Sequence, residues 1–393
     1  RNLAWTAECA VSLVGATPED FSLSYLPLSH IAEQMFTIHV PATTGGAVYF
    51  AESIERVADN LKEVRPTVFF GVPRIWEKFH AGVTARLKEA RGIKRKLLDW
   101  AMKVGRQVTD LKNRGRSPAG LLALEYRLAD RLVYSKIKAA LGMDRARVCV
   151  SGAAPVSPEI LEFFAGLDLI IYEVYGQSED TGPTSFNVPG KTKFGTVGPP
   201  LPGVEVKIAD DGEVLVKGPN VFKGYYKNEA ATRETLVDGW LHSGDLGEFD
   251  EEGFLRITGR KKDIIITAGG KNIAPKNIEA ALKDLPLVSE AVVIGDRRKF
   301  LSALITLDVE AAKGFVGNDN THPLHEHPKI LAEIDKGVKS VNEKFARVEH
   351  IRKFKVLPRN FTIEDGELTP TLKVKRKVVN EHFAEEIESM YRD

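Results

Sequence analysis

Two oppositely charged side chains, Asp245 and Arg260, lie fifteen residues apart in the sequence. Each is expected next to the end of a predicted strand. Asp245 follows a short strand-like run, and a turn there would leave it exposed; Arg260 follows a second strand-like run, 254–257, which breaks at Gly259. A carboxylate accepts and a guanidinium donates, so both could reach one hydroxylated ligand such as a ribose. The charged residues 261–263 predict a hinge. The alternative is an exposed hairpin with solvated charges.

Two glycine-bearing turns each follow a predicted strand. The strand 147–151 runs into Ser-Gly-Ala-Ala-Pro at 151–155, and the strand 169–175 runs into Tyr-Gly-Gln-Ser-Glu at 175–179. A short helix over 158–164 predicts a βαβ unit, and open α/β sheets bind ligands at the carboxyl ends of parallel strands. The first turn lets backbone approach a flat ring, while the second offers an aromatic face, a hydroxyl and a carboxylate. Taken singly, each could be an ordinary strand-ending turn.

Length and composition favour a globular protein with at least two cored domains, since the 393 residues are 43% hydrophobic and 28% charged. Lys and Arg together exceed Asp and Glu by only one (55 against 54), so the overall charge indicates no nucleic-acid partner. The cysteines Cys9 and Cys149 lack metal-ligand spacing, which suits buried thiols in a reducing compartment. We find no transmembrane-length apolar run and no signal peptide, and therefore expect a cytoplasmic protein.

The first part of the chain is predicted to form alternating strands and helices. Residues 47–50 and 67–70 are β-prone and flank a helical face over 54–61, which predicts another βαβ unit. A long helical region follows over 75–141. Two apolar stripes at helical spacing are expected in its core: Leu97, Ala101, Val104, Val108 and Leu111 in one, and Leu121, Leu124, Leu128 and Leu132 in the other.

The later part changes to short strands and then to a small α+β unit. Residues 203–208 and 213–217 flank an Asp-Asp-Gly turn, which predicts a β-hairpin. The elements expected beyond the hinge are helices at 278–285 and 330–345 and strands at 289–294 and 301–307. The basic segment 368–377 reads as a loop-like tail with solvated charges.

Seven motifs in order resemble the adenylate-forming (ANL, AMP-binding enzyme) superfamily, and most closely its long-chain fatty acid–CoA ligases, over essentially the whole chain. They are YLPLSH at 25–30, SGAAP at 151–155, YGQSE at 175–179, GEVLVKGPNVFKGYY at 212–226, HSGD at 242–245, GRKKD at 259–263 and TPTLK at 369–373. The resemblance implies a multidomain α/β fold. A large N-terminal domain, 1–259, of α/β sheet layers with a β-hairpin subdomain would precede a small, mobile α+β C-terminal domain, 260–393, with its hinge near 260–263.

The resemblance implies a two-step reaction. A long-chain fatty acid attacks the α-phosphate of ATP to give acyl-AMP and pyrophosphate, and the thiol of CoA then displaces AMP. The nucleotide-binding residues that it implies are Gly152, Ala153, Ala154, Tyr175 and Gly176 around the adenine, and Asp245 and Arg260 at the ribose. The implied co-substrates are ATP and CoA, together with Mg²⁺.

The catalytic roles are also implied by the resemblance. Lys373 would neutralise charge growing between carboxylate and α-phosphate, and Ser178 would meet that phosphate or the acyl carboxylate. Glu179 would help to hold Mg²⁺, and His30 would sit near the acyl and thioester end.

The hinge and the CoA tunnel follow from the same resemblance. The small domain would swing about Lys262 after adenylation, which withdraws Lys373. A strand over 267–271 would then reach the site, with Gly269, Gly270 and Lys271 lining the CoA tunnel.

The sequence departs from the resemblance in two places. The Ser/Thr- and Gly-rich phosphate-binding loop would precede Arg1 and is absent, so a truncated form is expected; residues 43–46 do not replace it, because no lysine follows. Leu372 stands where most of the superfamily has glycine before the lysine. Two alternatives stay open: an acyl-AMP ligase that loads a carrier protein, although no insertion follows Arg260, and an inactive nucleotide- or acyl-binding fragment, which the absent loop favours.

The expected partners are a long-chain fatty acid, ATP and CoA, with no nucleic acid. A homodimer and a peripheral contact with a membrane surface are also expected. The basic run 91–96 could make that contact, with a solvated helix end as the alternative.

Overall fold

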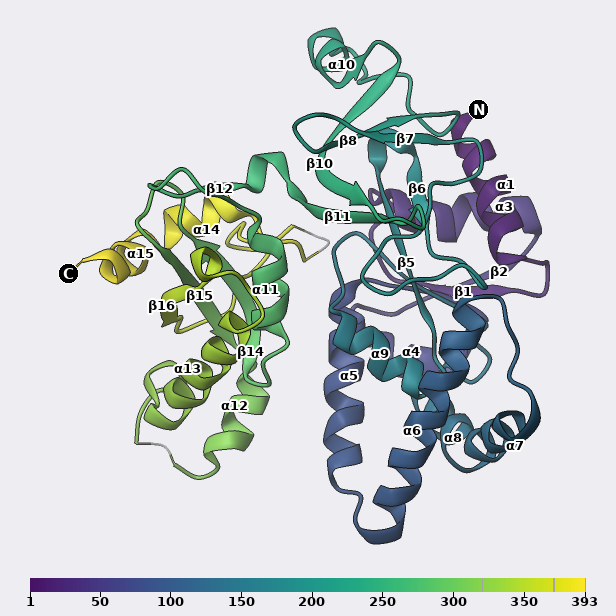
Figure 1. Ribbon diagram of the computed structural model, residues 1–393, viewed down its shortest axis with the longest axis horizontal. Helices are drawn as coiled ribbons and strands as arrows, with labels where there is room; N and C mark the ends of the chain where they lie inside the picture. Colours follow the sequence, from purple (N-terminus) through teal and green to yellow (C-terminus); the bar gives the residue numbers. More distant parts are fainter. Residues whose placement is uncertain (320, 370–371, 393) are drawn as a thin grey trace. The chain divides into compact units, whose positions relative to one another are not determined.

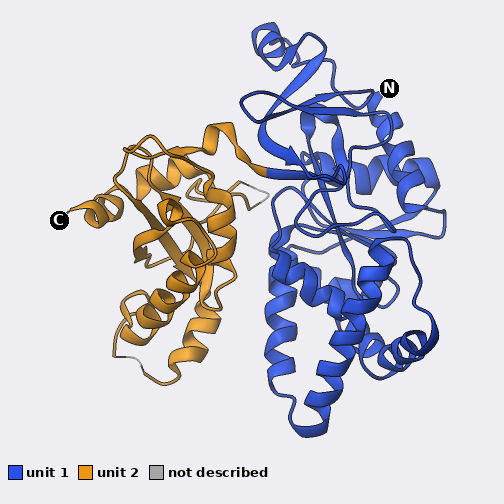
Figure 2. Cartoon of the chain, viewed as in Figure 1, with its two compact units in different colours: residues 1–257 blue, residues 258–393 orange. Residues whose placement is uncertain are grey.

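The computed structural model describes residues 1–319, 321–369 and 372–392. The chain divides into two compact units, residues 1–257 and 258–393, which are described separately (Figure 2). The predicted domain boundary after residue 259 and the hinge at 260–263 stay predictions.

The central sheet of unit 1 has the strand order β3-β4-β5-β6. Its strands are β3 (Val68–Gly71), β4 (Val148–Ser151), β5 (Ile171–Gln177) and β6 (Gly182–Phe186). The first three are parallel and β6 is antiparallel. All side chains of β4 are buried, as in a parallel strand covered on both faces. Helix α9 (Pro158–Gly166) joins β4 to β5, so this predicted βαβ unit and the α/β class are confirmed.

The other predicted βαβ unit is wrong in its strand pairing. Strand β2 (Ala47–Phe50) pairs in parallel with β1 (Phe21–Ser24), whereas β3 pairs with β4. The strand β1 was not predicted, and two of its four residues are the serines Ser22 and Ser24. They are buried through hydrogen bonds: Ser24 Oγ donates to Glu33 Oε1 at 2.5 Å, and Ser22 Oγ to the Phe36 carbonyl at 3.3 Å.

Helices fill the end of unit 1 opposite strands β7, β8 and β10 (Figure 1). They are α5 (Pro73–Lys88), α6 (Gly92–Asn113), α7 (Gly120–Ala129) and α8 (Ser135–Leu141), with a π-helical turn over Asp130–Tyr134. The first predicted stripe is confirmed at its centre, where Ala101, Val104 and Val108 are buried. The second is wrong for three of its four leucines: Leu121, Leu124 and Leu128 are exposed, because α7 packs against α6 through its other face. Leu132 is partly buried against the same cluster.

A second sheet of unit 1 has the order β11-β10-β8-β7, with β9 beside β10. Its strands are β7 (Glu205–Ile208), β8 (Glu213–Lys217), β9 (Leu236–Val237), β10 (Trp240–Phe249) and β11 (Leu255–Arg260), the last of which continues into unit 2. The β7–β8 hairpin is confirmed, with Gly212 at φ +85° in its turn. Two expectations are wrong: Asp245 lies inside β10 rather than in a turn, and β11 runs through Gly259 without breaking.

Unit 2 holds a three-stranded sheet between two helical layers. Its strands are β14 (Val288–Ile294), β15 (Leu301–Leu307) and β16 (Ile351–Val356) in that order. One face packs against α11 (Pro275–Lys283), α12 (Val309–Val316) and α13 (Pro328–Asn342), and the other against α14 (Arg376–His382) and α15 (Ala384–Tyr391). The helices predicted at 278–285 and 330–345 and the strands predicted at 289–294 and 301–307 are therefore confirmed.

The basic segment 368–377 is only partly a loop. Its residues 370 and 371 lie outside the described ones, and from Arg376 the chain forms the helices α14 and α15, which were not predicted. Arg376 is anchored by an ion pair with the buried Glu279. The remaining α-helices and strands are α1 (Asn2–Val14), α2 (Ile31–Gln34), α3 (Val40–Thr44), α4 (Val57–Val64), α10 (Glu229–Thr235), β12 (Ile265–Ile266) and β13 (Asn272–Ile273).

Candidate functional site

The two predicted turns lie at the same edge of the central sheet. Strands β4 and β5 are parallel neighbours with Ser151 opposite Glu173. The turn 151–155 therefore begins at the end of β4, next to the end of β5, where the turn 175–179 begins. This is the carboxyl edge, where α/β sheets bind ligands.

The backbone of the first turn is close to β5 and partly strained. A Cβ on Gly152 would lie 2.7 Å from Val174 Cγ1 and 3.0 Å from the Val174 carbonyl oxygen, so only glycine fits without movement. Ala153 has φ +71°, a left-handed conformation that an L side chain rarely adopts and that concentrates at functional sites. Ala154 is exposed.

Glycine is also required in the second turn. A Cβ on Gly176 would lie 1.5 Å from the Gly182 carbonyl oxygen of the antiparallel neighbour β6. The close approach of these two backbones holds the turn 175–179 against β6.

Tyr175 and Asp245 are brought together across seventy residues of sequence. The Tyr175 hydroxyl donates a hydrogen bond to Asp245 Oδ2 at 2.9 Å, and both side chains are buried. Burial first, and then the charge of Asp245, raise the pKa of Tyr175 well above its ordinary range. One predicted ribose ligand therefore lies beside the predicted adenine turn.

A bulge in β10 positions Asp245. The register of β10 against β8 shifts between His242 and Leu246, and Gly244 within it has φ +71°. The Ser243 hydroxyl donates to the Val214 carbonyl at 2.6 Å and accepts from the Asp245 N–H at 3.0 Å. The bulge thus explains how this carboxylate is held inside a strand.

Glu213 is a supporting residue that sequence reasoning missed. It is 5% exposed, accepts from the Gly244 N–H at 2.8 Å and lies 3.1 Å from His242 Nδ1. A carboxylate near the start of the motif at 212–226 thereby fixes the bulge of the motif at 242–245. An acidic residue is rare in a buried strand, and this rarity could have identified Glu213 from the sequence.

Ser178 and Glu179 lie in a 3₁₀ turn, Ser178–Asp180, directly after β5. Ser178 is exposed and Glu179 is half-buried. The Tyr225 hydroxyl donates to Glu179 Oε1 and the Phe222 N–H to the Glu179 carbonyl, each at 2.7 Å. The segment 218–226 is therefore tied to the catalytic turn that sequence analysis predicted.

Glu179 offers a half-buried carboxylate, the kind of oxygen ligand that Mg²⁺ prefers. The described residues contain no group of three or more His, Cys, Asp or Glu side chains placed to hold a metal. Mg²⁺ is commonly held by one or two carboxylates plus the phosphates of its substrate, and Glu179 supplies one such carboxylate.

Asp180 is a second residue that sequence reasoning missed. It is fully buried, and its carboxylate accepts from the Gln177 N–H at 2.7 Å and from the Thr184 hydroxyl. Burial raises its pKa to about 8 although both hydrogen bonds oppose the shift. Burial likewise raises the pKa of Glu173 to about 8. Burial therefore favours the protonated form of both carboxyls below about pH 8 at this edge of the sheet.

His30, at the end of the motif 25–30, is the N-cap residue of α2. Its Nδ1 accepts from the Ala32 N–H at 3.1 Å. The buried Glu33, which was not predicted, accepts from the Thr37 hydroxyl at 2.9 Å and the Tyr25 N–H at 3.2 Å. Glu33 thus fixes the loop that carries His30.

Unit 2 contains the predicted hinge and CoA-tunnel residues. Arg260 ends β11, and Lys262 lies in the 3₁₀ turn Lys261–Asp263. The strand predicted over 267–271 is wrong. These residues form a turn between β12 and β13, closed by a hydrogen bond from the Gly270 N–H to the Thr267 carbonyl at 2.8 Å, because Gly269 and Gly270 favour a bend and Gly270 has φ +72°.

Lys373 is an exposed residue of unit 2. Its N–H donates to Thr369 Oγ1 at 3.0 Å, and its carbonyl accepts from the Thr369 N–H at 2.8 Å. Leu372 has φ +60°. This left-handed conformation favours glycine. It therefore gives a physical reason for the glycine that most of the superfamily has where this chain has Leu372.

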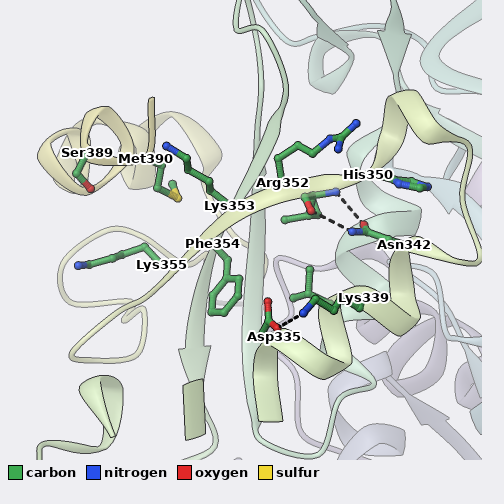
Figure 3. A pocket seen from close by; sticks show the side chains of 12 residues that line it. Asp335, Lys339, Asn342, His350, Arg352, Lys353, Phe354, Lys355, Ser389 and Met390 are labelled. Carbon is green, nitrogen blue, oxygen red and sulfur yellow. Dashed lines mark hydrogen bonds and ion pairs between the residues drawn. The ribbon is translucent and has the colours of Figure 1, made fainter. Parts of the chain in front are cut away.

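A surface pocket of about 520 Å³ lies elsewhere in unit 2, between α13, β16 and α15 (Figure 3). Asn342 borders it and exchanges two hydrogen bonds with the backbone of Ile351, at 2.8 and 3.0 Å. Asp335 and Lys339 form an ion pair at 2.6 Å on its wall. None of the predicted site residues lines this pocket.

Comparisons with known proteins agree with the motifs. Residues 1–226 match the family model of the AMP-binding enzymes, and residues 262–393 match the model of the AMP-binding enzyme C-terminal domain. The long-chain-fatty-acid–CoA ligase FadD15 of Mycobacterium bovis is 44% identical over 378 residues, 94% of this chain and 62% of the relative. The long-chain-fatty-acid–CoA ligase ACSBG2 of Xenopus laevis is 40% identical over 428 residues, 100% of this chain and 58% of the relative.

Solved structures show the same fold. The A-PCP didomain of a carboxylic acid reductase from Segniliparus rugosus, in complex with AMP, has a TM-score of 0.71 at 22% identity and covers 100% of this chain and 51% of that one. ATP-bound MatB from Rhodopseudomonas palustris has a TM-score of 0.66 at 24% identity, with 97% and 64% covered. On its motifs, its fold and the matched family models, the chain belongs to the AMP-binding enzyme family.

Proposed function

We propose that this chain is the larger part of an ATP-dependent long-chain fatty acid–CoA ligase, which forms acyl-AMP and transfers the acyl group to CoA. The observation that carries the proposal is the Tyr175–Asp245 hydrogen bond, which sets an expected ribose ligand beside the expected adenine turn. The two relatives described above bear the name of this ligase and support the substrate class. The chain spans only 62% and 58% of their lengths, so the activity is proposed for the whole protein.

The residues of unit 1 bind and orient in this proposal. The backbone of 152–154 and the Tyr175–Gly176 turn hold the adenine, and Asp245 accepts from the ribose hydroxyls. Ser178, exposed at the end of β5, donates to the α-phosphate or the acyl carboxylate. Mg²⁺ neutralises phosphate charge when it is bound with ATP, and Glu179 contributes to holding it. His30 borders the acyl and thioester end.

The residues of unit 2 act in two different arrangements. Arg260 donates to the ribose, and Lys373 neutralises charge that develops between carboxylate and α-phosphate. Rotation about Lys262 then withdraws Lys373 and brings the turn containing Gly269, Gly270 and Lys271 toward the thiol of CoA. The predicted domains, 1–259 and 260–393, would move relative to one another.

The cellular setting also belongs to this proposal. We place the enzyme in the cytoplasm, as a homodimer in peripheral contact with a membrane surface. No helix in the described ranges has the length and apolar character needed to span a membrane. Carrier-protein loading is disfavoured by the fatty-acid–CoA ligase names of the relatives.

The first test measures nucleotide binding by the chain itself. We expect isothermal titration calorimetry to detect AMP, and Asp245→Ala to weaken binding about ten- to hundredfold, because a hydrogen bond to a charged acceptor contributes about 1.5–3 kcal/mol. Glu229→Gln, on the exposed helix α10, is the matched control and should bind like the wild type. If Asp245→Ala binds AMP with the affinity of the wild type, Asp245 has a structural role and does not bind the ribose.

The second test separates the ligase from an inactive binding fragment. Supplied palmitoyl-AMP and CoA should give palmitoyl-CoA and AMP, detected by liquid chromatography. AMP binding without this transfer, also in a longer form that restores the relatives' length, would favour the binding fragment.

A further inference from the structure

Helix α7 presents a stripe of three leucines to solvent, here called the α7 stripe. Leu121 is 72% exposed, Leu124 63% and Leu128 49%. Spacings of three and four residues align them along one face of the helix. Single exposed leucines are ordinary, but an aligned set on a ten-residue helix indicates an interaction surface.

The packing of α7 does not use this stripe. On the other face, Ala129 is fully buried in the cluster formed with α6. The Tyr126 hydroxyl donates to Asp168 Oδ2 at 2.9 Å, and Lys112 Nζ donates to the same hydroxyl at 2.9 Å. The helix is therefore held in place independently of Leu121, Leu124 and Leu128, and its apolar residues cover two faces rather than one.

The segment that carries the α7 stripe is rich in exposed basic side chains. The exposed cations of residues 114–136 are Arg114, Arg116, Arg127, Arg131 and Lys136. None of the five forms an ion pair with another residue that the structure describes. The acids of this segment are Glu125 and Asp130, and Asp130 already accepts from the Ser135 hydroxyl at 2.9 Å. The segment is thus strongly cationic in a chain whose net charge is only +1.

The tip between α5 and α6 repeats this combination. Ile93 is 84% exposed within the basic run 91–96. Both the tip and α7 lie at the end of unit 1 opposite strands β7, β8 and β10 (Figure 1). A second apolar side chain among cations therefore lies at the same end as the α7 stripe.

We propose that the α7 stripe and its cations form a docking surface for an anionic lipid bilayer. The leucines would enter the boundary between headgroups and acyl chains, and the arginines would pair with lipid phosphates. A bilayer adapts to a convex helix face, whereas a protein partner would need a complementary groove. The proposal gives a location to the membrane contact proposed above, and the measurement below involves no catalysis, so the reaction and the surface can fail separately.

The test is flotation of the chain with vesicles. We expect binding to vesicles of equal parts phosphatidylcholine and phosphatidylglycerol, weaker binding at high salt, and little binding to phosphatidylcholine alone. Arg127→Gln and Arg131→Gln should each weaken binding about fivefold, because each basic residue near such a surface contributes about 1 kcal/mol. The triple variant Leu121→Ser, Leu124→Ser, Leu128→Ser should lose binding.

The matched control changes exposed apolar residues elsewhere. Val309→Ser with Phe315→Ser, on α12 of unit 2, should bind vesicles like the wild type. The triple variant should keep its near-ultraviolet circular dichroism, because the three leucines are not part of a core. Absence of binding by the wild type, or equal binding by the triple variant, would overturn the proposal. A wild-type dimer that the triple variant abolishes in sedimentation, without vesicle binding, would overturn it in favour of a second copy of the chain.

Discussion

The buried carboxyl of Asp180 should make the stability of unit 1 fall as the pH rises. Burial raises its folded-state pKa to about 8, whereas an unfolded chain has the ordinary value of 3.8. The folded state therefore keeps a proton that the unfolded state loses between these values. The stabilising contribution is complete below about pH 4 and is lost progressively up to about pH 8, at about 1.4 kcal/mol per pH unit.

Asp180→Asn should remove this dependence. An amide can accept from the Gln177 N–H through its oxygen and donate to the Thr184 hydroxyl through its nitrogen, so it resembles the protonated acid. Between pH 5 and pH 7 the free energy of unfolding of the wild type should fall by about 3 kcal/mol more than that of the variant. Glu173 titrates in both proteins and cancels from the difference.

Urea unfolding followed by tryptophan fluorescence measures this difference. All four tryptophans, Trp5, Trp76, Trp100 and Trp240, belong to unit 1, so the signal reports that unit alone. Glu229→Gln changes an exposed carboxylate and should follow the wild type at every pH. Parallel curves for wild type and Asp180→Asn would refute the reasoning, since the hydrogen bonds to Asp180 would then keep it ionised despite burial.

Three further predictions concern the turns and the second unit. In a full-length enzyme that contains this chain, Lys373→Ala should slow acyl-AMP formation at least about a hundredfold and spare acyl transfer from supplied acyl-AMP; equal loss of both half-reactions would contradict a role in one arrangement only. Lys262→Pro should leave adenylation intact and block acyl-CoA formation, because proline fixes its own φ and restricts the preceding residue; acyl-CoA at the wild-type rate would exclude Lys262 as the hinge. Gly176→Ala should destabilise unit 1 by more than about 4 kcal/mol in urea unfolding, since its Cβ would lie 1.5 Å from a backbone oxygen, whereas Gly82→Ala, with no heavy atom within 4 Å of its Cβ, should not destabilise it. A stable Gly176 variant would show that β5 and β6 can separate.

The sequence alone determined the elements whose periodicity is local. Alternation and helical spacing identified the unit with β4, α9 and β5, the β7–β8 hairpin and, in unit 2, the elements α11, β14, β15 and α13. The ordered motifs also led to the family, because a binding turn keeps its residue types next to one another along the chain. For this reason the turns at 151–155 and 175–179 could be predicted as neighbours before any coordinates were known.

Only the tertiary structure decided which side chains are buried and which distant ones meet. The bulge that places Asp245 beside Tyr175 depends on Glu213 in another strand, and the burial of Ser24 in β1 depends on its hydrogen bond to Glu33. Periodicity also cannot choose between two apolar faces of one helix, which is why Leu121, Leu124 and Leu128 were expected in the core and are exposed. Burial is a property of what packs against a residue, and the neighbours of these residues are far away in the sequence.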